Sequence, residues 1–102
     1  MPSIAQLEKL LTLDPSDPFV HYGLAQEQAK AGEIDQALES YTKVIELDPS
    51  YCYAYFFKGQ LLHGKGNGSE AVQVLETGIQ AAKQANDAKA ISELTSLLQS
   101  MT

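Results

Sequence analysis

The chain has no arginine and no tryptophan, and Cys52 is its only cysteine. A single cysteine excludes an intrachain disulfide and any metal site that needs several cysteines. The seven basic residues are all lysines and stand against 13 acidic residues, which gives a net charge of −6. Nucleic-acid binding depends on clustered cationic contacts to phosphates, and arginine is the side chain that grips phosphate with two parallel bonds. The composition therefore argues against nucleic acid as a partner.

A long hydrophobic run is also missing. The apolar runs are a few residues long, far from the ~20 residues that cross a bilayer, and no basic segment leads into an apolar one at the start. We therefore expect neither a membrane partner nor secretion. The lone cysteine fits a reducing compartment, so we expect a cytoplasmic location. With 44% hydrophobic and 20% charged residues over 102 positions, the chain is typical of one soluble globular domain.

What the chain does contain is a repeat. The peptide Leu-Asp-Pro-Ser occurs at Leu13–Ser16 and again at Leu47–Ser50, and Pro15 and Pro49 are 34 residues apart. A period of this length predicts a stack of helical hairpins. The segments that follow the two peptides agree when they are aligned at this interval, with the pairs Gly32 and Gly66, Ala37 and Ala71, Ile45 and Ile79, and Ala25 and Gly59.

The spacing of apolar residues and the turn residues predict six helices. The first is expected over Ser3–Leu13 and ends where Asp14 precedes a proline. Asp17 is expected to cap the second helix, Ser50 the fourth, and Asn67 with Glu70 is expected to form a capping box at the fifth. The expected ranges are 3–13, 18–31, 34–47, 51–63, 68–85 and 87–101.

The second unit departs from the first at two places. Lys83 stands where a third Asp-Pro would place proline, so the fifth helix is free to continue, and the last helix is interpreted as a cap over the open end of the stack. Gly78 stands in the middle of a helix where the first unit has Val44. Because glycine inside a helix costs ~1 kcal/mol relative to alanine, we expect the second hairpin to be the softer one.

The small residues Ala25 or Gly59 in the first helix and Ala37 or Ala71 in the second, together with the period and the closing Asp-Pro, resemble the tetratricopeptide repeat family. The aromatic residue Tyr41 and the glycine between the helices fit the same pattern. The resemblance implies an all-α solenoid of helical hairpins, with about six helices in a single domain over residues 1–102. Its parts would be a half-repeat helix at 3–13, repeats at 18–49 and 52–85, and a capping helix at 87–101.

The resemblance also implies a binding site. In proteins of this family the first helix of each unit lines a concave groove that accepts an extended peptide or a partner helix. Carried over to this chain, the groove residues would be Phe19, Tyr22, Gln26, Lys30, Tyr53, Phe56, Gln60 and His63. Four rings on a small surface suit an apolar or aromatic partner. The alternative interpretation is that several of these rings pack inside the protein.

The branch of the family that grips the C-terminal carboxylate of chaperones does so with cationic and amide side chains. The matching places here hold Tyr22, Gln26 and Phe57, which provide no cation, so chaperone-tail binding is not expected. We expect a non-catalytic adaptor that holds a protein or peptide partner. The alternative is a structural homodimer that uses the same aromatic face.

An enzyme is not expected, because no catalytic pair or cofactor loop is present, and no cofactor is implied. His21 and His63 lack further ligands at metal-binding spacing, so no metal site is expected. Cys52 is expected near the start of a helix, where its thiol pKa could fall, but no basic residue lies close to it in the sequence and a structural role is favoured.

Overall fold

A computed structural model describes residues 2–102 of the chain. Within these residues it contains six α-helices and no strand, so the all-α prediction is confirmed. The chain divides into two compact units, Met1–Asp48 and Pro49–Thr102. The boundary in the sequence falls between the aspartate and the proline of the second Leu-Asp-Pro-Ser peptide. The single domain expected over residues 1–102 stays a prediction. The helices are α1 (Ile4–Leu13), α2 (Pro18–Lys30), α3 (Ile34–Leu47), α4 (Cys52–Gly64), α5 (Gly68–Gln84) and α6 (Ala88–Ser100).

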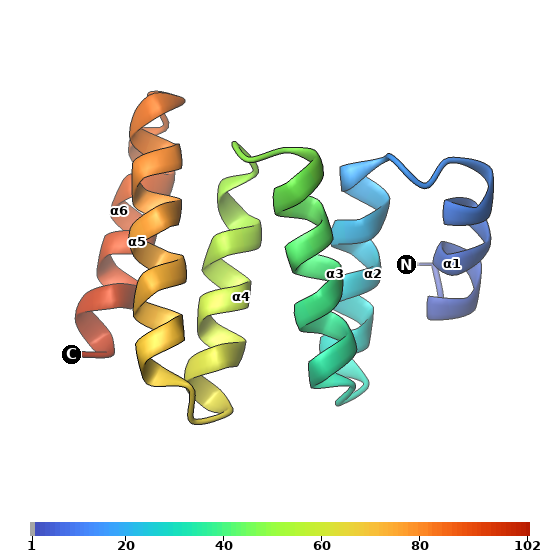
Figure 1. Cartoon of the computed structure of the whole chain (residues 1–102), viewed down its shortest axis with the longest axis horizontal. Helices are drawn as coiled ribbons and strands as arrows, with labels where there is room; N and C mark the ends of the chain where they lie inside the picture. The colour runs from blue at the N-terminus through green and yellow to red at the C-terminus, as the bar shows by residue number, and fades with distance from the viewer. Residues whose placement is uncertain (1) are drawn as a thin grey trace. The chain divides into compact units, whose positions relative to one another are not determined.

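The first unit is built on the hairpin of α2 and α3, with α1 packed against α2 (Figure 1). Asp17 caps α2 as expected, since its side chain accepts a hydrogen bond from the backbone N–H of Phe19 at 2.9 Å. The hairpin turns at Gly32, whose φ of +80° is a conformation that side-chain-bearing residues rarely adopt. Leu7 is the buried residue of α1 and lies 3.6 Å from the position a Cβ atom would take at Gly23 of α2.

The core of the first unit lies between α2 and α3. Ala25, Ala37 and Val44 are fully buried, and Tyr41 is 1% exposed. Because alanine is small, the two backbones can approach closely, and the tyrosine ring fills the remaining space. The residues that carry the family resemblance are therefore the packing residues of this hairpin.

The second unit repeats the hairpin in α4 and α5, and α6 packs against both helices (Figure 1). Gly66 makes the turn with a φ of +94°. Leu75 and Ala82 of α5 are fully buried, and Leu94 of α6 is 1% exposed. Since α6 buries Ala90 and Leu94 and exposes Ser92 and Ser96, it has the amphipathic pattern expected of a capping helix.

The two units tie the loop before each hairpin to its first helix in the same way. His21 Nε2 lies 2.8 Å from the carbonyl oxygen of Pro15, and the Tyr55 hydroxyl donates to the carbonyl oxygen of Pro49 at 2.7 Å. Both partners in the second bond lie 34 positions after those in the first. A different side chain therefore satisfies the same backbone carbonyl in each unit.

Two of the predicted helix caps are wrong. Tyr51, and not Ser50, occupies the N-cap of α4, and its side chain makes no cap bond. Asn67 does occupy the N-cap of α5, but its ψ of 62° is not extended, and neither its cap bond nor the box with Glu70 forms. Within residues 2–102, a capping box forms at α1, where it pairs Ser3, whose ψ of 166° is extended, with Gln6. An extended backbone is the conformation that aims an N-cap side chain at the helix N–H groups.

Candidate partner-binding faces

Each unit displays one stripe of the predicted site residues on the first helix of its hairpin. In α2 the stripe residues are three, four and four positions apart, and in α4 they are three, four and three apart, so each set lies along one side of its helix. We call them the α2 stripe and the α4 stripe. The α2 stripe is Phe19, Tyr22, Gln26 and Lys30, and the α4 stripe is Tyr53, Phe56, Gln60 and His63.

The aromatic residues of the two stripes are not enclosed by the protein. Phe19 is 72% exposed, which is unusual for so large an apolar side chain. Tyr22, Tyr53 and Phe56 are each partly exposed. Packing inside the protein, the alternative interpretation of these rings, therefore covers only part of their surface.

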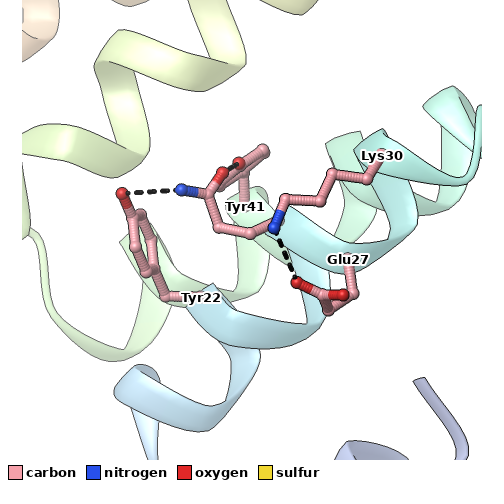
Figure 2. A network of polar contacts seen from close by, with 5 residues as sticks. Tyr22, Glu27, Lys30 and Tyr41 are labelled. Carbon is pink, nitrogen blue, oxygen red and sulfur yellow. Dashed lines mark hydrogen bonds and ion pairs between the residues drawn. The ribbon is translucent and has the colours of Figure 1, made fainter. Parts of the chain in front are cut away.

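Gln26 is hydrogen-bonded inside the first unit to Tyr22 and Tyr41, the two tyrosines labelled in Figure 2. Its amide nitrogen donates to the hydroxyl of Tyr22 at 3.3 Å, and its amide oxygen accepts a hydrogen bond from the hydroxyl of Tyr41. The rings of Tyr22 and Tyr41 also meet edge to face, with centroids 5.9 Å apart and an interplanar angle of 66°. Burial, followed by the nearby Tyr22, raises the pKa of Tyr41 far above its ordinary value. The Tyr22 ring is therefore held by the core of its own hairpin.

Lys30 is the last residue of the α2 stripe. It forms an ion pair with Glu27, with Nζ and Oε2 3.2 Å apart (Figure 2). The lysine side chain is 66% exposed, so solvent screens this ion pair and its contribution to stability is small. The lysine is accessible to solvent, whereas the Glu27 side chain is only 19% exposed.

The aromatic residues of the α4 stripe belong to a cluster of three rings. The ring centroids of Tyr53 and Phe56 are 6.4 Å apart, and those of Phe56 and Phe57 are 5.1 Å apart, both edge to face. The Tyr53 hydroxyl donates to Oε1 of Glu93 in α6 at 3.2 Å. Partial burial and then this hydrogen bond raise the pKa of Tyr53. Gln60 and His63 are exposed at the far end of the stripe.

Two residues that shape these stripes were not predicted. Tyr41 was noted only as part of the family pattern, and although a buried phenol needs a hydrogen-bond partner, the repeat does not indicate that the partner is Gln26. Glu93 lies on α6, outside the 34-residue repeat, and no pattern in the sequence connects it with Tyr53. The internal bonds of Gln26 also limit the role expected for it as a group that hydrogen-bonds a partner.

The remaining candidate sites carry little chemistry. Cys52 is buried, and its thiol donates to the carbonyl oxygen of Ser50 at 3.3 Å. Residues 2–102 contain no group of three or more histidine, cysteine, aspartate or glutamate side chains that could hold a metal ion. In the same part of the chain, no helix combines the length and the apolar character needed to span a membrane.

Comparison with known proteins identifies the repeats. The tetratricopeptide repeat family matches residues 18–51 and again residues 53–85. The TPR repeat-containing protein PA0015 of Pseudomonas aeruginosa is 28% identical over 98 residues, covering 96% of this chain and 93% of that protein. A tetratricopeptide repeat domain protein from Salinibacter ruber, solved in solution, is 32% identical with a TM-score of 0.80, covering 86% of this chain and 89% of the other.

Some similar proteins are much longer, and some share the fold at lower identity. The chain spans only 6% of the length of Superkiller protein 3 of Saccharomyces cerevisiae. The type III secretion chaperone SycD of Yersinia enterocolitica, solved with a peptide of the translocator YopD, has a TM-score of 0.85 at 22% identity, covering 96% of this chain and 76% of that one. With both repeats matched by the family and a solved relative of similar length, the chain belongs to the tetratricopeptide repeat family.

Proposed function

We propose that this protein is a non-catalytic interaction module that binds a peptide or a helix of a partner protein through the α2 and α4 stripes. The observation that carries the proposal is the exposure of aromatic rings at equivalent positions of two successive repeats, with Phe19 at 72%. Exposed rings in soluble proteins are typical of binding surfaces, because they bury a large area on binding and lose little side-chain entropy.

The roles of the stripe residues follow from their surroundings. Phe19, Tyr22, Tyr53 and Phe56 would be the apolar anchors. Gln60, which is exposed, would hydrogen-bond the backbone or side chains of the partner, whereas Gln26 would keep the Tyr22 ring in place. Lys30 and His63 would lie at the ends of the two stripes. A peptide or protein partner also agrees with the fold, since a chain of similar fold was solved with a bound peptide.

The experiment compares capture of proteins from native lysate by the wild-type chain and by Tyr22→Ala/Phe56→Ala. The matched control is Glu39→Ala/Gln73→Ala, which changes exposed residues of α3 and α5 that are also 34 positions apart. We expect the stripe variant to lose the captured protein and the control to keep it, with equal helicity by circular dichroism. Undiminished capture by the stripe variant would reject the assignment. A cytoplasmic location is part of the same proposal and is checked by fractionating the source cells.

A second candidate is a homodimer that pairs the same stripes, and the exposure of Phe19 favours it as well. Light scattering over a concentration series tests it. A dimer would double the mass at high protein concentration, and Tyr22→Ala/Phe56→Ala would return the mass to that of a monomer. A constant monomer mass over the micromolar range would dismiss this candidate.

A further inference from the structure

Apart from Phe19, the large apolar side chains that are exposed in the described residues are Leu10, at 46%, and Leu13, at 80%. Both belong to α1, and together with neighbouring residues they line a hollow on its surface. We call this surface the α1 face; it consists of Pro2, Gln6, Lys9, Leu10 and Leu13. None of these residues belongs to the α2 or α4 stripe.

The repeat indicates what kind of element fits this face. At an interval of 34 residues, Leu10 corresponds to Val44, which is fully buried, and Gln6 corresponds to Ser40, which is 8% exposed. The α3 residues are covered because α2 lies against them, and Ser40 donates to Gln28 of α2 at 2.7 Å. At Gln6 and Leu10 the α1 face therefore has the register of a surface that a helix covers in the next unit, whereas Lys9 corresponds to Lys43, whose side chain is 50% exposed.

The charge on the α1 face indicates which side chains a bound helix should carry. Lys9 is the one charged residue among those that line the hollow, and it belongs to a protein with a net charge of −6. An acidic side chain opposite it would be favourable, whereas a second α1 face would bring two copies of Lys9 together.

We propose that the α1 face binds an amphipathic helix of another protein, lying against α1 as α2 lies against α3. The helix presents leucine-sized and small side chains to Leu10 and Leu13 and an acidic residue to Lys9. The capping helix α6 of a second copy does not meet this description, because none of its exposed side chains is large and apolar or acidic. They are Ala88, Lys89, Ser92, Ser96, Gln99 and Ser100. This site shares no residue with the aromatic stripes, so an experiment that rejects one of the two sites does not reject the other.

The probe is a synthetic peptide with the sequence of residues 17–32, which contains the helix that covers α3 and has its own N-cap, Asp17. Titrated into the full-length ¹⁵N-labelled protein, it should shift the amide resonances of Gln6, Lys9, Leu10 and Leu13. A scrambled peptide of the same composition should leave them in place. Absence of shifts at these residues at millimolar peptide, or shifts confined to the second unit, would overturn the proposal.

Four single substitutions make the test specific. Leu13→Lys alters the most exposed residue of the face and Leu10→Lys alters its centre, while Thr12→Lys adds the same charge at an exposed position of α1 that does not line the hollow. We expect the first two to abolish the shifts and Thr12→Lys to retain them. Lys9→Glu should weaken binding of the peptide, whose net charge is negative, by roughly two- to five-fold. Equal binding by all four variants would contradict the site.

Light scattering of the protein alone separates a partner helix from a second copy. The proposal expects the same monomer mass for the wild type and for Leu13→Lys over the micromolar range. A doubled mass that Leu13→Lys abolishes would overturn it, because the face would then be covered by a second copy of this chain.

Discussion

The hairpin of α2 and α3 encloses a pair of polar side chains where the hairpin of α4 and α5 has apolar ones. Ser40 donates to Gln28 at 2.7 Å inside the first hairpin, and the residues 34 positions later are Val74 and Leu62. One position along α3, Tyr41 bonds to Gln26, and the residue 34 positions after Tyr41 is the apolar Leu75, whereas Gln26 corresponds to the exposed Gln60. No buried side-chain nitrogen or oxygen in the described residues lacks a hydrogen-bond partner.

The second hairpin closes through two glycines instead. A Cβ atom at Gly59 would lie 2.6 Å from Leu75 Cδ2, and one at Gly78 would lie 2.6 Å from Tyr55 Cβ. The larger residues of this hairpin thus pack directly on the backbone of the facing helix. The same hairpin geometry is therefore compatible with two kinds of core. The core of the first hairpin depends on polar side chains that hydrogen-bond to each other, and the core of the second depends on the space left by two glycines.

Leu75→Ala should have the largest effect on stability. It removes a fully buried side chain opposite Gly59, and we expect it to lower the free energy of unfolding by about 2–5 kcal/mol, because the rigid hairpin leaves a cavity. Adding Gly59→Ala should then recover part of the loss, although Gly59→Ala alone should be destabilising. Urea unfolding of the four proteins in this cycle measures the coupling. Strictly additive effects would show that Leu75 and Gly59 do not share one space.

Gly78→Ala tests the second close approach. Alanine is the better helix former, but its Cβ would meet the Cβ of Tyr55, which is close to the backbone and cannot swing aside. We therefore expect a destabilisation of about 1–3 kcal/mol. Gly64→Ala is the matched control, since nothing lies within 4 Å of the added Cβ, and it should be neutral or stabilising by about 0.4–1 kcal/mol. Thermal unfolding compares them, and similar melting temperatures for both variants would refute the contact.

Ser40 and Gln28 of the first hairpin can be replaced by the residues found at the same places in the second hairpin, which are valine and leucine. Ser40→Ala should cost about 1–3 kcal/mol, because the Oε1 atom of buried Gln28 loses its donor. Gln28→Leu/Ser40→Val, which installs the residues of the second hairpin, should cost less than the single substitution. Denaturant unfolding decides the order. A double variant less stable than Ser40→Ala would show that the two interiors are not interchangeable.

A smaller effect should appear at alkaline pH. Burial raises the pKa of Tyr41, so the folded state holds this phenol neutral while the unfolded chain ionises it near its ordinary value of about 10. The contribution of Tyr41 to stability is therefore complete below that pH and is lost as the pH rises toward the raised pKa. Tyr41→Phe should unfold with a weaker dependence on pH between about 9 and 11. An unchanged dependence would place the titrating group elsewhere.

The period, the turns and the small residues were sufficient to predict the six helices, because Gly32, Gly66 and the Asp-Pro pairs act locally on the backbone. The range of α3 agrees at both ends, and the ends of the other helices differ by one residue or less. The cap at Ser50 was wrong because α4 begins at Cys52, which places Tyr51 at the N-cap, and the cap at Asn67 was wrong because its side chain makes no cap bond. From the sequence, Gly78 was interpreted as a residue that weakens its helix. The structure adds that the absence of a side chain at Gly78 leaves the space that Tyr55 occupies. That the second hairpin is the softer one stays a prediction.

The stripes could be placed from the repeat, but their internal bonds could not. Tyr22 and Gln26 are four positions apart on one helix, so their contact is local, whereas the bond from Tyr41 joins residues 15 apart and depends on how the hairpin closes. Glu93 meets Tyr53 across 40 residues, through a helix that does not follow the repeat. Contacts of that kind depend on tertiary packing, which the periodicity of the sequence does not specify.

The central claim is that partners bind to the α2 and α4 stripes. Its most direct test is chemical-shift mapping of the aromatic side chains of the labelled protein on addition of a peptide from a partner that the wild-type chain captures. The account predicts that the largest shifts occur at Phe19, Tyr22, Tyr53 and Phe56. Shifts concentrated around Glu39 of α3 and Gln73 of α5, with these four rings unchanged, would contradict it.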